Sequence, residues 1–209
     1  MAGQRVEGGA EDAGTAGRGG SFARAVTEMF APQYVGIAMP PVAGLSAEGW
    51  TGLAWGLLAA AVCAGVPAVV IAVGVRRGRL DSIHLVERKS RKGPMLIGLA
   101  AVLVGLTALA LLDAPRVVVA SVAVMLAWVL VMGPITLVWK ISFHTGVSAG
   151  TAVVLAYVLP AVPVLVVGAV VVAVIGWARV QVSHHTAAQA LAGAAVGAAA
   201  AWATLAMML

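Results

Sequence analysis

Long runs of apolar residues without a charged side chain restrict the fold of this chain more than any other feature. A helix of about 20 apolar residues is long enough to cross the hydrocarbon core of a bilayer. The chain is 62% hydrophobic and 10% charged, which is more apolar than a soluble domain of 209 residues needs. We therefore predict an all-α polytopic membrane helix bundle with about six or seven spans of roughly 20 residues each.

Prolines and polar residues set the expected bounds of the spans. Pro160 and Pro163 interrupt the run 146–178, which is longer than one span requires. Proline breaks or kinks a helix, so we expect a hairpin of two helices there, with one long kinked helix as the alternative. The stretch 31–47 carries three prolines and is close to the roughly 17-residue minimum for a span. The expected spans are 31–47, 51–75, 95–112, 117–138, 146–159, 162–177 and 187–208.

The first residues differ in composition from the rest of the chain. Residues 1–22 are rich in Gly and Ala and have no apolar run directly after a basic start, so we predict a disordered tail and no signal peptide. Residues 23–209 would form one membrane-embedded domain. Within it, a short interfacial helix is expected before the first span, with an apolar side made by Phe22, Ala25, Val26, Met29 and Phe30.

With a hairpin at Pro160, three polar loops fall on the same side of the membrane. The loop 76–94 holds seven of the thirteen Lys and Arg residues, and the loops 139–145 and 179–185 carry most of the other polar groups. The opposite side has little that ionises beyond Glu48, Asp113 and Arg116. Polar groups that gather from separate loops at one membrane face predict a functional site there.

Several functions and bonds are disfavoured by composition. Aromatic residues are few and are not interleaved with the basic ones, which argues against nucleic-acid binding. Cys63 is the single cysteine, so an intrachain disulfide is excluded.

Gly193 and Gly197 have the spacing that lets two helices approach closely. The oligomeric state stays open, with a homodimer as one option.

The third loop combines a cation, two imidazoles and a helix start. Arg179 and His185 lie six residues apart, and Gln189 follows His185 by four, which places His185 and Gln189 on one face of a helix beginning near Thr186. The free N–H groups and positive dipole end of a helix N-terminus favour anions such as phosphate. The loop therefore predicts an anion site with a candidate nucleophile, and an ordinary interfacial loop with positive flanking residues is the alternative.

This third loop resembles a motif of the type 2 phosphatidic acid phosphatase family, the membrane lipid phosphatases. The family motif is Ser-Arg-x5-His-x3-Asp, and Ala178, Arg179, His185 and Gln189 reproduce its spacing with Ala for Ser and Gln for Asp. The form His-Thr-x-x-Gln is similar to the dolichyl-diphosphate phosphatase branch. The family resemblance covers about residues 76–200.

The two other loops resemble the remaining family motifs less closely. The segment Ile141-Ser142-Phe143-His144 keeps the Ser and His of Pro-Ser-Gly-His. For Lys-x6-Arg-Pro, Arg91 fits the arginine, His84 stands at the lysine position, and Pro94 comes three residues after Arg91. Arg88 or Lys89 could stand in for the lysine.

The resemblance implies a mechanism without metal or cofactor. His185 would attack phosphorus and form a phosphohistidine, and His144 would protonate the leaving lipid oxygen. Gln189 would accept the Nδ1–H of His185 in place of the family's aspartate. The phosphoryl oxygens would be held by Arg179 and Arg91, with Ser142, Lys140 and Arg88 as further candidates. The partner would be a membrane lipid substrate, a lipid phosphate or an isoprenyl diphosphate.

The resemblance also implies a multi-pass protein of the bacterial plasma membrane. Lys and Arg concentrate on the side of the three loops, and the positive-inside rule places that side in the cytoplasm. The family's site usually faces away from the cytoplasm, so the two criteria disagree.

Two other functions compete with phosphatase activity. The first is a family member with impaired catalysis that binds or moves phospholipid, which the incomplete first motif and the neutral Gln189 favour. The second is a redox protein with haem ligands among His144, His184 and His185. These histidines fall in loops at one edge and do not face one another across a bundle, which argues against haem.

Overall fold

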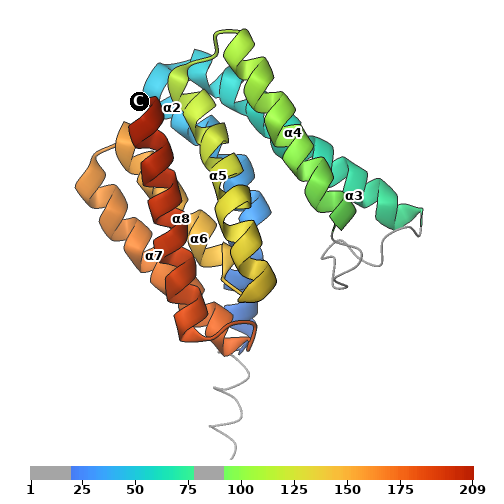
Figure 1. Cartoon of the computed structure of the whole chain (residues 1–209). Coiled ribbons are helices and arrows are strands. Elements are labelled where there is room, and N and C mark those ends of the chain that lie inside the picture. The colour runs from blue at the N-terminus through green and yellow to red at the C-terminus, as the bar shows by residue number, and fades with distance from the viewer. Residues whose placement is uncertain (1–19, 78–91) are drawn as a thin grey trace, which may run out of the picture.

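The computed structural model describes residues 20–77 and 92–209, and its regular structure in these ranges is helical throughout, which confirms the all-α prediction. A helical segment at 20–29, here called the N-terminal helix, precedes the labelled elements. The predicted disordered tail 1–22 lies outside the described residues except for 20–22, which belong to this helix. The elements that follow are α2 (Pro32–Ala60), the π-helical η1 (Ala61–Gly65), α3 (Val66–Arg76), α4 (Lys92–Leu111), α5 (Arg116–Val138), α6 (Phe143–Val158), α7 (Ala161–Gln181) and α8 (Ala187–Met208) (Figure 1).

Three of the described helices, α5, α7 and α8, are long and apolar enough to cross a membrane. The segment Leu96–Leu111 of α4 and the whole of α6 are apolar but shorter. The chain therefore has the helices of a membrane protein. The predicted number of six or seven spans stays a prediction.

The element α2 contains a reversal of the chain at Gly49. This residue has φ +61°, a conformation that glycine adopts at little cost. A Cβ on Gly44 would collide with the Gly52 backbone, and one on Gly56 would collide with the backbone of Pro40. These contacts between residues 8 and 16 positions apart require the two halves of α2 to run antiparallel. The expected helices 31–47 and 51–75 are therefore separate, as predicted.

The hairpin between α6 and α7 is also confirmed. Leu159 has an extended backbone and follows the last residue of α6, and Pro160 directly precedes the first residue of α7. Proline is well placed just before or at a helix start because its missing N–H would have no partner there. The alternative of a single kinked helix over 146–178 is thus wrong.

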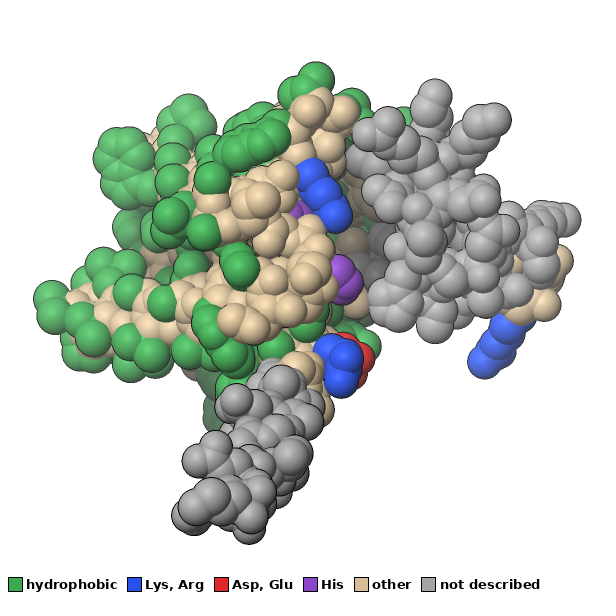
Figure 2. Space-filling model, turned by 90° about the horizontal axis from the view of Figure 1, so that it is seen from below, with side chains coloured by type: hydrophobic (Ala, Val, Ile, Leu, Met, Phe, Trp, Pro, Cys, Tyr) green, Lys and Arg blue, Asp and Glu red, His purple; other side chains and the backbone are tan. Residues whose placement is uncertain are grey.

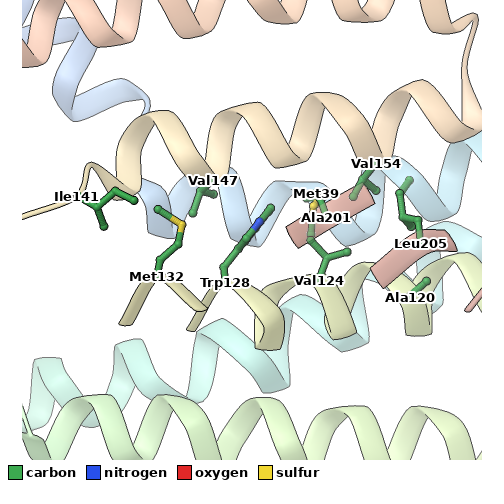
Figure 3. Close-up of a cluster of buried hydrophobic side chains, with 11 residues drawn as sticks. Met39, Ala120, Val124, Trp128, Met132, Ile141, Val147, Val154, Ala201 and Leu205 are labelled. Atoms are coloured by element: carbon green, nitrogen blue, oxygen red, sulfur yellow. The ribbon is translucent and has the colours of Figure 1, made fainter. Parts of the chain in front are cut away.

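Glycines let α6 and α8 pack backbone against backbone. A Cβ on Gly197 would collide with the Gly146 backbone, and one on Gly193 would collide with the Ser142 carbonyl. The Trp128 indole on α5 donates a 3.0 Å hydrogen bond to the Gly197 carbonyl at this crossing. The predicted close packing of Gly193 and Gly197 is confirmed, and their partner is α6 of the same chain. The largest cluster of buried side chains, including Val124, Trp128 and Met132, lies around it (Figure 3).

The N-terminal helix packs on the end of α7. Ala23 and Val26 are buried against Ile175 and Ala178, and the rings of Phe22 and Trp177 lie 6.1 Å apart. Of the predicted apolar side, Val26 is buried in this contact, whereas Ala25, Met29 and much of Phe22 are exposed. Close approach to α7 requires a small residue at the contact, and Ala23 supplies it.

Candidate functional site

The polar connections of the chain converge at one end of the bundle. The N-terminal helix, the α5–α6 connection and the α7–α8 connection all lie at the lower end in Figure 1, opposite the C-terminus. Seen from below, Lys, Arg and His side chains gather at this end (Figure 2). The segment 78–91 of the first polar loop, with His84, Arg88, Lys89 and Arg91, lies outside the described residues.

The backbone after α7 brings both histidines back toward Arg179. Arg179 is in the last turn of α7, and Ser183 then adopts φ +55°, a left-handed conformation typical of helix ends. The N–H groups of His184 and His185 donate to the Arg179 carbonyl at 3.1 and 3.2 Å. The spacing Arg-x5-His therefore corresponds to one folded-back turn.

A capping box begins α8 directly after His185. The Thr186 hydroxyl accepts the Gln189 N–H at 3.3 Å, and the Gln189 side-chain carbonyl accepts the Thr186 N–H at 3.1 Å. Reciprocal bonds of this kind satisfy two N–H groups that the first helical turn leaves free. They hold the backbone next to His185 in a defined conformation.

The α5–α6 connection is fastened to the start of α8. Ser142 is fully buried and caps α6, its hydroxyl accepting the Thr145 N–H at 3.4 Å. The Ser142 N–H donates to the backbone carbonyl of Gln189 at 3.2 Å, and the Thr145 hydroxyl donates to the backbone carbonyl of Ala190 at 2.8 Å. The structure thus brings together the two segments that carry His144 and His185.

The His185 imidazole is held by the backbone of the α5–α6 connection. Its Nδ1 lies 3.1 Å from the Lys140 carbonyl oxygen, and a carbonyl can only accept, so Nδ1 carries the hydrogen and Nε2 keeps its lone pair. The Gln189 side chain also raises the pKa of His185, but its carbonyl oxygen accepts the Thr186 N–H of the capping box. The expectation that Gln189 would be the acceptor for Nδ1–H therefore needs correction, because the Lys140 carbonyl takes that place.

The electrostatics of the α7–α8 connection favour neutral imidazoles at His184 and His185. Burial lowers the pKa of His185 from its ordinary value, and the nearby Arg179 guanidinium lowers it further. Burial also lowers the pKa of His184, with Arg179 and Lys140 adding to the effect. A neutral imidazole is the form that can act as a nucleophile.

A polar cavity of about 890 Å³ opens between the N-terminal helix, the α5–α6 connection and the end of α7. His185 borders this cavity through its contact with Lys140 but is not one of the lining residues, and the neighbouring His184 is. Ser142 also lies away from the lining, beneath the first turn of α6. The titratable or hydroxyl-bearing residues of the lining include Arg24, Thr27, Glu28, Lys140, His144, Arg179 and His184.

Two residues that line this cavity each have a buried polar atom without a partner in the described part of the chain. Arg179 is 8% exposed, and its Nε makes no hydrogen bond. The buried Oγ1 of Thr27 makes none either. Buried polar groups in folded proteins are almost always hydrogen-bonded, so these two groups have hydrogen-bonding capacity left for a ligand with acceptor atoms. A buried guanidinium indicates that this ligand is an anion.

The N-terminal helix is the part of the site that sequence reasoning missed. It supplies Arg24, Thr27 and Glu28 to the cavity, and the Thr27 backbone lies close to the His144 imidazole. The amphipathic pattern of Phe22–Phe30 indicated a helix in this place. Nothing in that pattern indicated that its polar side would face His144 and Arg179.

An apolar cavity of about 420 Å³ lies beside the polar one, between α6, α7 and the start of α2. Phe30 and Val35 line it close to Ala31 and Gln33, which line the polar cavity.

Within residues 20–77 and 92–209, three or more His, Cys, Asp or Glu side chains nowhere gather in a way that could hold a metal ion.

No family model, curated protein or solved structure matches this chain.

Proposed function

We propose that this protein is a membrane phosphatase that hydrolyses a lipid phosphate or an isoprenyl diphosphate through a phosphohistidine, as the resemblance to the type 2 phosphatidic acid phosphatase family implies. The observation that carries the proposal is the buried Arg179 guanidinium with an unpartnered Nε, which lines a cavity together with His144 and lies one turn from His185. A phosphoryl group supplies the acceptor oxygens that this guanidinium lacks.

The reaction has two steps in the proposed site. Nε2 of His185 attacks phosphorus, an N–P bond forms, and the bond between phosphorus and the leaving oxygen breaks. His144 gives a proton to that leaving oxygen as general acid. His144 then takes a proton from water, which attacks phosphorus, and the N–P bond breaks to release inorganic phosphate and neutral His185.

Charge stabilisation in this site comes mainly from arginine. Phosphoryl transfer depends on positioning and on balancing the charge of the equatorial oxygens. Arg179 and Lys140 line the cavity for this purpose, and Arg91 and Arg88 are proposed to join them from the first loop. Ser142 is proposed to act by positioning His144, since its hydroxyl caps α6.

The lipid character of the substrate is supported by the surroundings of the cavity. The seven apolar helices proposed to cross the membrane place the polar cavity at one edge of the bilayer. The neighbouring apolar cavity can take the first part of a hydrocarbon chain while the phosphate lies against Arg179. A free, fully polar phosphate ester would leave this apolar cavity unused.

One observation favours a second function, binding of a lipid phosphate without turnover. His185 borders the cavity without lining it, and Gln189 carries no charge to stabilise an imidazolium. A protein with this arrangement would retain the anion site and lose the nucleophile.

Phosphate release by the purified protein separates the two functions. The substrates are phosphatidate, phosphatidylglycerophosphate and prenyl diphosphates, each presented in lipid nanodiscs. The proposal predicts release from at least one substrate and none from Arg179→Gln protein. Binding of these lipids without any phosphate release would establish the second function instead.

A further inference from the structure

We propose that the Thr27 hydroxyl is a substrate-binding group that donates a hydrogen bond to a phosphoryl oxygen, which makes the N-terminal helix a working part of the site. The inference rests on the proposed function for the identity of the anion. It adds a ligand-binding residue that lies outside the three motifs of the family resemblance.

The first observation is the environment of the hydroxyl itself. Thr27 and Arg179 both line the polar cavity, and each has a buried polar atom, Oγ1 of Thr27 and Nε of Arg179, that makes no hydrogen bond with the described residues. A hydroxyl offers one donor and can turn to suit an acceptor. An anion bound to Arg179 would satisfy both groups at once.

The second observation is the contact between Thr27 and the candidate general acid. Thr27 and His144 line the same cavity, and the Thr27 backbone lies close enough to the His144 ring to act on its protonation. This arrangement places the Thr27 hydroxyl next to the phosphoryl group on which His144 would act.

The third observation is that the N-terminal helix is anchored. Ala23 and Val26 are buried against Ile175 and Ala178, the latter being the neighbour of Arg179 in the chain. The ring contact between Phe22 and Trp177 adds a second attachment on α7. Thr27, one residue after Val26, is therefore held at a defined position relative to Arg179.

Binding of inorganic phosphate to the full-length protein tests this proposal without knowledge of the lipid. Thr27→Val removes the hydroxyl at nearly constant volume and keeps the carbonyl, whereas Thr27→Ser keeps both. A hydrogen bond to a charged group corresponds to a factor of about 10 to 100 in affinity. We expect Thr27→Val to weaken phosphate binding, measured by calorimetry, by about this factor, and Thr27→Ser to bind like the wild type.

The matched control is Ser148→Ala. The Ser148 hydroxyl is also buried without a partner, but it lines the apolar cavity, so its loss should leave phosphate binding unchanged. Thr27→Ala replaces the valine variant if the latter does not fold. Unchanged phosphate affinity in folded Thr27→Val or Thr27→Ala protein would overturn the role of Thr27.

The same titrations separate this inference from the proposed function. If Thr27→Val and Arg179→Gln both weaken phosphate binding but no lipid is hydrolysed, the anion site stands and the phosphatase proposal fails. If lipid phosphate is hydrolysed and only Arg179→Gln affects phosphate binding, the phosphatase proposal stands and the role of Thr27 fails.

Discussion

At the scale of single residues, the protonation of His185 controls the proposed chemistry. Nδ1–H donates to the Lys140 carbonyl, so attack must use Nε2 in its neutral form. Burial and Arg179 both lower the pKa of His185, which keeps Nε2 unprotonated to a lower pH than for an ordinary histidine. The Lys140 carbonyl opposes these effects only in part.

A pH profile checks this assignment. Because the pKa of His185 is lowered, kcat/KM should fall on the acid side only below about pH 6.5, the ordinary value for histidine. Lys140→Arg keeps both the backbone carbonyl and the charge and should leave the acid limb in place. An acid limb centred at or above about pH 6.5 would show that His185 is not the group that must be neutral.

Gln189 also stabilises the start of α8 through the capping box, a role that its position in the motif does not indicate. Gln189→Leu removes the side-chain half of the capping box and should lower the free energy of unfolding by about 0.5–2 kcal/mol. Turnover should fall roughly tenfold or more, because a shift in the α8 start moves His185, and ~1.4 kcal/mol corresponds to a factor of ten.

Gln189→Glu is the control for this change, since it keeps the length and the acceptor oxygens. Thermal unfolding and phosphate release measure the two effects separately. Normal stability and normal turnover in Gln189→Leu protein would contradict both the capping role and the catalytic role.

At the scale of elements, the crossing of α6 and α8 sets the distance between the two candidate histidines. A Cβ on Gly197 would collide with the Gly146 backbone, so Gly197→Ala must push the helices apart. We expect a loss of about 1–3 kcal/mol in stability together with a loss of phosphate release, because overpacking displaces backbone.

Gly133→Ala on α5 is the matched control for the crossing. A Cβ on Gly133 would meet nothing within 4 Å, and alanine favours a helix more than glycine does. Its thermal unfolding in detergent should occur at the same temperature as the wild type or higher. Equal stability of the Gly197→Ala and Gly133→Ala variants would contradict the close crossing.

Most helices could be predicted from the sequence because each apolar run ends at a proline or a polar loop. The prolines Pro115 and Pro160 stand directly before α5 and α7. The buried side of the N-terminal helix could not be predicted, because small residues such as Ala23 become contact residues only when a partner helix is present. The position of Thr27 in the cavity could not be predicted for the same reason.

The candidate site was predictable to a similar extent. The sequence placed Arg179 and His185 in one loop, and in the structure the His185 N–H donates to the Arg179 carbonyl. The acceptor for His185 could not be predicted, because Lys140 is 45 residues away and uses its backbone, which carries no sequence signal.

At the scale of the whole molecule, the polar end must face one compartment. Positive residues at this end favour the cytoplasm by the positive-inside rule. Ser183 is exposed near the cavity, and Glu48 is exposed beside the Gly49 reversal at the other end. Single cysteines at these two positions, with Cys63 replaced by alanine, report the orientation.

In intact cells, an impermeant maleimide should label Glu48→Cys and should label Ser183→Cys only after the membrane is opened. The reverse pattern would place the cavity outside the cytoplasm, where members of the type 2 phosphatidic acid phosphatase family usually carry their site. Labelling of both positions in intact cells would contradict the proposed arrangement of spans.

Direct detection of the phosphoenzyme tests the central claim, that His185 carries the phosphoryl group. The purified protein is mixed with the lipid substrate that it hydrolyses, and the reaction is quenched in alkali because phosphohistidine survives there. The protein is then digested for mass spectrometry. We predict phosphate on His185, none in His185→Ala protein, and normal labelling in His184→Ala protein. Phosphate on His184, or phosphate release by His185→Ala protein at the wild-type rate, would contradict the account.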